Sequence, residues 1–226
     1  MTVVITGASR GIGKELINFF LEKEYQIIAV SSNPDAIKIK NDKLKIIKAD
    51  FSDTTSVFKT AEQIKQFTNE VSILINNAAT LVNKPFAQIT PADFEKVYKI
   101  NVEAPYFLTQ QLLDIMGKTQ TSHIINISSI GGFMGSAKFA GLSAYSSSKG
   151  ALSILTECLA EELKEKNIKA NCLCLGSVNT EMLKQAFPGY EAPLNPPQMA
   201  QYIGDFAITG HHYFNGKVLP VSVSTP

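Results

Sequence analysis

Seven short apolar runs, separated by segments of helical periodicity, restrict the fold more than any other feature of this sequence. Several runs are apolar on both faces, as expected of parallel strands that helices cover on both sides. The runs lie at residues 2–6, 26–30, 44–48, 72–76, 123–128, 169–175 and 217–223, with amphipathic segments at about 12–24, 55–69, 92–116 and 144–166. This alternation predicts an α/β fold: a three-layer, doubly wound sheet of about seven mostly parallel strands.

Nothing in the sequence divides the chain, so we expect residues 1–226 to form one domain. The proline-rich piece "PGYEAPLNPP" (188–197) is too short to separate domains and is interpreted as a loop before the last strand. Only about 13 residues join the second and third strands, close to the minimum for a parallel crossover, so any helix there must be very short.

Composition excludes several classes of protein. A formal charge of +1, without blocks of like charge, argues against nucleic acid and anionic membrane as partners. Cys158, Cys172 and Cys174 form no Cys-x-x-Cys pair, and His123 and the pair at 211–212 form no cluster with carboxylates or cysteines, so we expect neither disulfides nor metal. Cys172 and Cys174 share one strand face and are expected in the core. With no apolar run long enough for a membrane span and no signal peptide, the expected location is cytoplasmic.

The stretch "TGASRGIG" (6–13) follows the first strand and opens the first helix. Gly7, Gly11 and Gly13 permit positive φ angles and allow backbone N–H groups to approach a pyrophosphate at the helix N-terminus. A plain glycine-rich turn is the alternative, but the position at the first strand-to-helix junction favours a dinucleotide site.

The end of the second strand indicates which dinucleotide is bound. A carboxylate here would hold the free ribose 2′-OH of NAD(H), but the chain reads "VSSNP". Ser31 and Ser32 can donate hydrogen bonds to a 2′-phosphate, and Arg10 in the glycine turn can pair with the same group. The sequence therefore favours NADP(H), with NAD(H) as the alternative.

The stretch "YSSSK" (145–149) places Tyr145 and Lys149 one helical turn apart. A tyrosine of pKa near 10 gives little phenolate at neutral pH, and lowering that pKa by about three units takes roughly 4 kcal/mol. An ammonium group one turn away and the positive ring of an oxidised nicotinamide can supply this stabilisation in a dry cleft. Alone, the pair is typical of a helix surface; the preceding Ser129 and glycine turn favour acid–base catalysis.

A series of motifs in one order adds to this interpretation: "TGASRGIG" (6–13), "ADFSD" (49–53), "NNAA" (76–79), "KIN" (99–101), "NISS" (126–129), "YSSSK" (145–149) and "LGSVNT" (175–180). With them the chain resembles the short-chain dehydrogenase/reductases of the standard single-domain type. The resemblance covers residues 2 to 182 motif by motif and the last 44 residues loosely. It implies a Rossmann fold over the whole chain, with a short substrate lid at about 181–215.

The resemblance also implies roles for individual residues. Tyr145 would be the general acid/base, and Lys149 would depress its pKa and hold the nicotinamide ribose. Ser129 would bind the substrate oxygen, and Asn101 would help to hold a water and a proton path behind Lys149. The cofactor would contact Gly7, Ser9, Arg10, Gly11, Ile12, Gly13, Ser31, Ser32, Asp50, Phe51, Asn77, Ala78, Ala79, Tyr145, Lys149, Gly176, Val178 and Thr180.

Some features depart from the family pattern or leave alternatives open. Ala79 and Leu175 stand where glycine and proline are usual. Ser128 and Ser129 point to opposite sides of a strand, so one faces the cleft; the resemblance selects Ser129. The aromatic and methionine residues of the following loop cover the substrate, or else belong to the core or an oligomer contact: Phe133, Met134 and Phe139.

The sequence thus predicts an NADP(H)-dependent oxidoreductase that interconverts a ketone or aldehyde and an alcohol by hydride transfer. Two other functions stay open: an NADP(H)-binding sensor without turnover, for which the brief lid is the support, and a reductase of a pterin-like acceptor. The expected partners are a small-molecule substrate and, from the resemblance, further copies of the chain in a dimer or tetramer.

Overall fold

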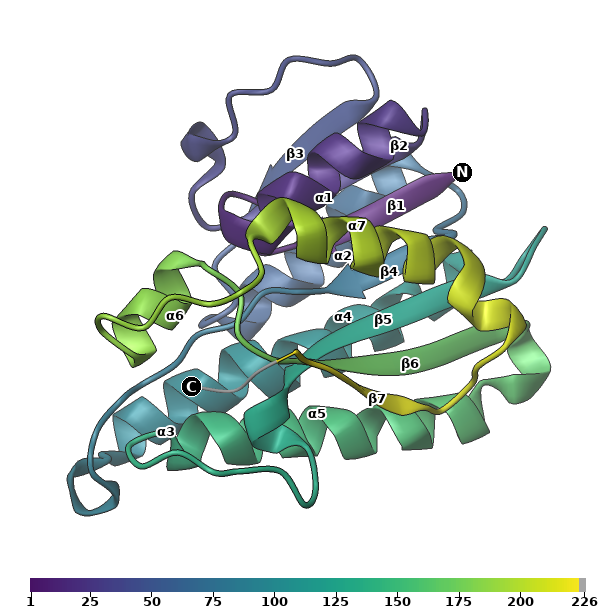
Figure 1. Ribbon diagram of the computed structural model, residues 1–226. Helices are drawn as coiled ribbons and strands as arrows, with labels where there is room; N and C mark the ends of the chain where they lie inside the picture. Colours follow the sequence, from purple (N-terminus) through teal and green to yellow (C-terminus); the bar gives the residue numbers. More distant parts are fainter. Residues whose placement is uncertain (224–226) are drawn as a thin grey trace.

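One sheet of seven parallel strands forms the centre of the molecule (Figure 1). The computed structural model describes residues 1–223. The strand order is β3-β2-β1-β4-β5-β6-β7, and every neighbouring pair is parallel. The strands are β1 (Thr2–Thr6), β2 (Gln26–Ser31), β3 (Leu44–Lys48), β4 (Ile73–Asn76), β5 (Ser122–Ser129), β6 (Ile168–Leu175) and β7 (Val218–Val221). The predicted fold class is confirmed, and the sheet is parallel throughout.

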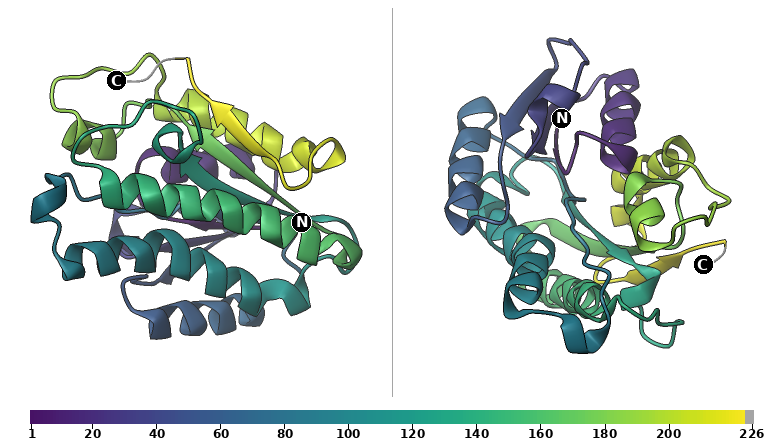
Figure 2. Two further views of the ribbon diagram at one scale, coloured as in Figure 1. Left: turned by 90° about the horizontal axis from the view of Figure 1, so that it is seen from below. Right: turned by 90° about the vertical axis from the view of Figure 1, so that its left-hand side faces the viewer.

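Helices cover both faces of the sheet (Figures 1 and 2). Helices α1 and α7 lie on one face, and α2, α4 and α5 lie on the other. The helices are α1 (Gly11–Glu22), α2 (Thr54–Phe67), α3 (Pro91–Tyr98), α4 (Ala104–Leu112), α5 (Ser143–Glu162), α6 (Glu181–Ala186) and α7 (Pro196–Thr209). Among residues 1–223, no helix combines the length and apolar composition that a membrane crossing requires.

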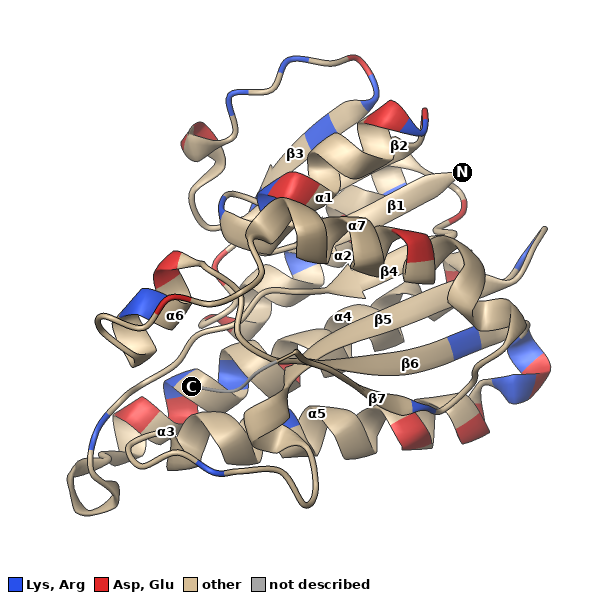
Figure 3. Cartoon of the chain, viewed as in Figure 1, with Lys and Arg blue, Asp and Glu red and all other residues tan. Residues whose placement is uncertain are grey.

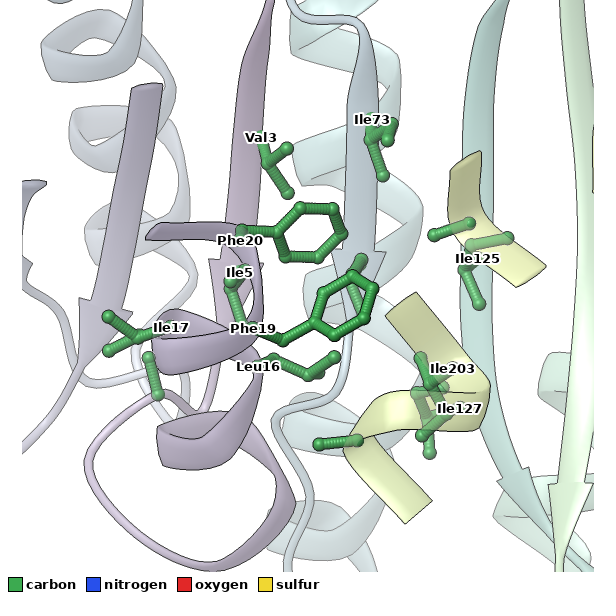
Figure 4. Close-up of a cluster of buried hydrophobic side chains, with 14 of the residues drawn as sticks. Val3, Ile5, Leu16, Ile17, Phe19, Phe20, Ile73, Ile125, Ile127 and Ile203 are labelled. Atoms are coloured by element: carbon green, nitrogen blue, oxygen red, sulfur yellow. The ribbon is translucent and has the colours of Figure 1, made fainter. Parts of the chain in front are cut away.

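Each face of the sheet carries its own apolar core, because successive strand residues point in opposite directions. In β1, Val3 and Ile5 pack toward α1 and α7, whereas Val4 packs toward the other layer. Figure 4 shows Phe19 and Phe20 of α1 against this first set of strand side chains. Strands that are apolar on both faces therefore appear in the sequence as continuous apolar runs. Cys172 and Cys174 of β6 are fully buried, as predicted.

Charged residues are distributed in agreement with this layering. Figure 3 shows Lys and Arg interspersed with Asp and Glu over the helices and loops, while the central strands carry few charges. The short connection between β2 and β3 holds only a 3-10 turn, Pro34–Ala36, as its length predicted.

The predicted helix at 92–116 is interrupted. Helix α3 continues into a π-helical turn at Lys99–Glu103 before α4 begins, and a 3-10 turn closes the segment. The π turn carries Asn101, whose side chain is fully buried. Such single turns often bring one side chain out of helical register at a functional site.

The proline-rich piece at 188–197 is a loop as far as Asn195, as predicted, but this loop does not lead to the last strand. Helix α7 begins at Pro196 and separates this loop from β7. Asn195 caps the helix by accepting a hydrogen bond from the backbone of Gln198, whose side chain accepts one in return from the Asn195 backbone. Proline at the first helical positions lacks only an N–H that would have no helical partner there, so it starts this helix.

Candidate functional site

A cavity of about 530 Å³ opens where the carboxyl ends of the strands meet. Between β1 and β4 the sheet changes the direction in which successive strands are added: β2 and β3 lie on one side of β1, and β4 to β7 lie on the other. The loops that leave β1 and β4 therefore diverge and create a crevice, the usual place for ligands in open α/β sheets. The volume is in the range of small-molecule sites.

Every predicted cofactor-binding residue lines this cavity, including the less distinctive positions at 9, 12, 78, 79, 176 and 178. Of the four predicted catalytic residues, Ser129, Tyr145 and Lys149 line it as well. Asn101 is fully buried and is not among the residues that line the cavity.

The glycine turn forms one side of the cavity. Gly7 and Gly11 have φ angles of +66° and +53°, and a Cβ on Gly13 would lie 2.2 Å from the Gly7 carbonyl oxygen. No side chain caps the N-terminus of α1, and its first turn contains no acidic residue. The first N–H groups of α1 are thus free to bind an anion, and the turn fits a pyrophosphate.

Asn77 fixes this turn against the next strand. Its side-chain amide donates to the carbonyl oxygens of Thr6 (2.9 Å) and Gly7 (3.2 Å). The Thr6 hydroxyl accepts hydrogen bonds from the backbone N–H groups of Asn77 and Ala78, both at 3.0 Å. The loops after β1 and β4 are therefore held together at the point where the crevice begins.

The ends of β2 and β3 form the far end of the cavity. Ser31 is buried, and its hydroxyl accepts a hydrogen bond from the backbone of Asn33, whereas Ser32 is exposed. Asp50 accepts hydrogen bonds from the backbone N–H and the hydroxyl of Ser52, which hold the pKa of its carboxyl below the usual value. Phe51, next along the chain, is buried.

Arg10 extends from the glycine turn to the start of α6. Its guanidinium group donates to the Glu181 carboxylate at 2.7 Å, and both side chains are about two-thirds exposed. Thr180 precedes Glu181 and caps α6 by accepting from the Leu183 backbone, while its methyl group faces Gly11. Hence α6 lies across one side of the cavity, tied to the glycine turn.

Ser129 and Tyr145 meet at the opposite end, at the junction of β5 and α5. Ser129 accepts a hydrogen bond from the Gly131 backbone at 3.2 Å. Burial raises the pKa of Tyr145 to about 12, and the nearby Ser129 hydroxyl opposes that rise. The protein on its own therefore keeps Tyr145 in its protonated form.

Lys149 is buried beneath Tyr145. Its ammonium group donates to the Ile127 carbonyl oxygen at 2.8 Å, and burial lowers its pKa to about 8. Ser128 also lines the cavity, but its hydroxyl donates to the Lys149 carbonyl oxygen at 2.8 Å. Ser129 is thus the serine of the pair that reaches Tyr145.

Asn101 connects three segments behind the site. Its side-chain oxygen accepts from the Thr80 backbone, and its amide donates to the Thr80 carbonyl oxygen and the Ser148 hydroxyl, all at 2.9 Å. Ser148 donates in turn to the Tyr145 carbonyl oxygen at 2.7 Å. Asn101 therefore positions the turn of α5 that carries Tyr145.

Apolar residues from three separate segments line the cavity near Tyr145. The sequence pointed to Phe139 and to the lid segment that contains Met182, Ala186 and Phe187, but not to Leu81 or Leu142. Phe133 and Met134 do not line the cavity, and Met134 is 86 % exposed. No local pattern marks these residues, because their meeting depends on how the loops fold back over the sheet.

Comparison with known proteins identifies relatives of this chain. The family model described as short chain dehydrogenase matches residues 1–191. The chain is 30 % identical over 187 residues to 3-oxoacyl-(acyl-carrier-protein) reductase FabG of Buchnera aphidicola, covering 81 % of this chain and 75 % of the relative.

Two solved structures extend the likeness to nearly the whole chain. A 4-hydroxyisoleucine dehydrogenase complexed with NADH aligns with a TM-score of 0.87 at 25 % identity, covering 98 % of this chain and 96 % of the other. The Pseudomonas aeruginosa RhlG/NADP active-site complex aligns with a TM-score of 0.85 at 26 % identity, covering 98 % and 94 %.

Proposed function

This chain belongs to the short-chain dehydrogenase family, and on that premise we propose that it is an NADP(H)-dependent oxidoreductase that interconverts a ketone or aldehyde and the corresponding alcohol. One observation carries the proposal. A single cavity has an uncapped helix N-terminus on one side and the neighbouring Ser129 and Tyr145 side chains at its end.

A nicotinamide dinucleotide is the cofactor that these residues fit. Two structural relatives are described with NADH and with NADP. In this chain the glycine turn would hold the pyrophosphate, and Asp50 and Phe51 would lie near the adenine. The preference for NADP(H) rests on Arg10, Ser31 and Ser32, whose donors suit a 2′-phosphate.

The chemistry divides between cofactor and protein. The bound dinucleotide supplies or accepts the hydride. In the reductive direction, the Tyr145 hydroxyl donates its proton to the carbonyl oxygen, while the Ser129 hydroxyl stabilises the negative charge that develops there. The protonated state of Tyr145, maintained by burial, suits this role.

Lys149 and Asn101 support this step. We propose that the Lys149 ammonium lowers the pKa of Tyr145 when the site is complete, so that alcohol oxidation can begin by proton transfer to Tyr145. Asn101, through Ser148, keeps the Tyr145 turn in place. The substrate lid would be α6 and the loop that follows, since α7 packs against α1 instead. A cytoplasmic homo-oligomer remains part of this proposal, and the free cysteines are in keeping with a reducing compartment.

The test combines binding and turnover. Purified protein should gain thermal stability with NADPH and oxidise it in the presence of members of a panel of aldehydes, ketones, diketones and quinones. Tyr145→Phe should lower kcat by about 10² to 10⁴ while leaving NADPH affinity within about threefold. Unchanged turnover in this variant would exclude the proposed mechanism. Cofactor binding without turnover across the panel would favour a sensor, and turnover confined to pterins would favour the other alternative.

A further inference from the structure

We propose that the substrate end of the cavity takes an uncharged, largely apolar carbonyl compound and rejects substrates that carry a carboxylate. This inference rests on the proposed function and specifies its substrate class. It is carried by the residues beyond Tyr145, by the positions of the charged side chains, and by the way in which the wall is held.

The wall beyond Tyr145 is apolar. Six side chains form it together with the tyrosine ring, and they belong to one cluster: Leu81, Phe139, Leu142, Met182, Ala186 and Phe187. The rings of Phe139 and Phe187 meet edge to face, with centroids 5.2 Å apart and planes at 76°. Apolar side chains from three segments of the chain, one of them helix α6, can thus bury contact area against an apolar substrate.

The charged side chains that line the cavity either have partners within the protein or lie at the end of the cavity away from the apolar wall. Among the described residues they are Arg10, Asp50, Lys96, Lys149 and Glu181. Arg10 and Glu181 pair with each other, and the Lys149 ammonium donates to the Ile127 carbonyl oxygen.

Asp50 and Lys96 belong to the other end of the cavity. Asp50 follows β3, and Lys96 is close enough to help lower the pKa of the Asp50 carboxyl. The apolar wall therefore offers no cation to a carboxylate, whose transfer into such a site without a partner is strongly unfavourable.

Asn83 holds the three wall segments in one arrangement. Its amide donates to the Ala186 carbonyl oxygen at 2.9 Å, at the end of α6. The next residue, Lys84, donates its backbone N–H to the Gly141 carbonyl oxygen at 3.0 Å. A Cβ on Gly141 would lie 2.1 Å from the Asn83 side-chain oxygen, and Gly141 has a φ of +84°. A side chain at position 141 would displace Asn83, so glycine here allows the contacts that join the three segments.

The experiment compares matched substrates at saturating NADPH. A series of 2-alkanones is measured beside oxo-carboxylates of the same length, such as 2-pentanone beside 4-oxopentanoate. We expect kcat/KM to rise about fourfold for each added methylene until the wall is filled. We expect each oxo-carboxylate to be at least about thirtyfold poorer than its ketone. Oxo-carboxylates turned over within threefold of the ketones would overturn the inference.

Two variants test the wall directly. Met182→Lys places a cation on a partly exposed wall position and should shift the ratio of kcat/KM toward the oxo-carboxylate by about tenfold or more. Lys184→Met, on the exposed side of the same helix, is the matched control and should leave the ratio unchanged. An equal shift in both variants, or none in Met182→Lys, would count against the proposed wall.

A binding measurement separates this inference from the proposed function. Unreactive N-alkylformamides are titrated into the protein–NADPH complex beside the same compounds with a terminal carboxylate. Selective binding of the uncharged series, without turnover of any carbonyl compound, would support the substrate class and overturn the enzymatic function. Turnover of charged substrates, with no affinity for the uncharged amides, would support the enzymatic function and overturn the substrate class.

Discussion

The ammonium nitrogen of Lys149 lies 5.9 Å from the centre of the Tyr145 ring, one helical turn further along α5. The ammonium is buried and donates to a backbone carbonyl oxygen. Burial therefore acts on both groups in the direction of neutrality, raising the pKa of Tyr145 and lowering that of Lys149. The unfavourable burial of the lysine charge is an energetic cost of the site.

Replacing the lysine should therefore stabilise the protein while abolishing activity. Lys149→Met is expected to raise the free energy of unfolding at pH 7 by about 2 to 4 kcal/mol, from a folded pKa of about 8 against the ordinary value near 10.4. The Lys149 amine binds its proton more tightly in the unfolded chain than in the folded one, so the wild type gains stability as the pH rises from 8 to 10.4. The difference in unfolding free energy between Lys149→Met and wild type should shrink over that window.

Urea unfolding of the cofactor-free protein at pH 7 and pH 10 checks this prediction. Lys164→Met, at an exposed lysine just after α5, is the control and should change stability by less than about 0.5 kcal/mol. A destabilised Lys149→Met variant at pH 7 would contradict the prediction.

Glu181 is expected to weaken NADPH binding by competing for Arg10. Glu181→Gln frees the guanidinium for a 2′-phosphate and should tighten NADPH about two- to fivefold, a small effect because the ion pair is exposed. NADH affinity should stay the same. Titration of both dinucleotides measures this, with Glu191→Gln, an exposed glutamate in the following loop, as control. Equal tightening of both dinucleotides would contradict the role assigned to Arg10.

Gly132 sets the distance between the loop after β5 and helix α5. A Cβ there would lie 2.6 Å from the carbonyl carbon of Lys149, so Gly132→Ala must push the loop that follows Ser129 away from α5. We expect a loss of about 1 to 3 kcal/mol in stability and at least a tenfold loss in kcat/KM.

Gly150, the residue after Lys149 in α5, supplies a matched control on the other side of the same contact. A Cβ on Gly150 would meet only the Gly132 carbonyl oxygen, at an ordinary 3.4 Å. Gly150→Ala should therefore keep activity and gain up to about 1 kcal/mol from the better helix propensity of alanine. Thermal unfolding and steady-state kinetics of the two variants test the pair; equal effects would show that the close approach is unimportant.

His123 has its tautomer fixed by a buried network. Nδ1–H donates to the Ala207 carbonyl oxygen at 3.0 Å, and Nε2 accepts from the Asn171 amide at 2.9 Å. Asn171 is itself oriented, since its oxygen accepts from the Lys217 backbone and its amide also donates to the Phe214 carbonyl oxygen. A proton on Nε2 would face an N–H donor that cannot turn away without breaking both bonds.

Stability should therefore fall in acid. Burial is the main cause that lowers the pKa of His123 to about 3. The neighbouring His211 and His212 lower it further, whereas the hydrogen bond to Ala207 opposes the shift. The unfolded chain takes up this proton first, so stability is lost from about pH 6.5 toward pH 3, by up to about 1.4 kcal/mol per pH unit. When the free energy of unfolding is measured by urea titration at several pH values, it should change less steeply with pH in His123→Gln than in wild type or His212→Gln. An identical pH dependence in all three proteins would refute the assignment.

Strands and the glycine turn were predictable because their signals are local. Strands buried on both faces must be apolar along their length, and positive φ at Gly7 and Gly11 favours glycine. The convergence of these pieces follows from parallel topology, since the carboxyl ends of all strands share one edge.

Helix α7 was missed because its two prolines suggest a break. The capping residues Asn195 and Gln198 were a usable signal, and with proline at the first helical position they mark a helix start. The Arg10–Glu181 pair and the contacts of Asn83 carry no such signal, because they join segments that are far apart in the sequence. Their partners are defined only by tertiary packing.

The packing of α1 against α7 sets the order in which the molecule can be completed. The ring of Phe19 lies where a side chain on Gly204 would be, so the first helix is covered by nearly the last one. A chain emerging from the ribosome holds the apolar face of α1 uncovered until α7 has been synthesised. Chains that stop before residue 204 should therefore be substrates for chaperones and proteases rather than partly active enzymes.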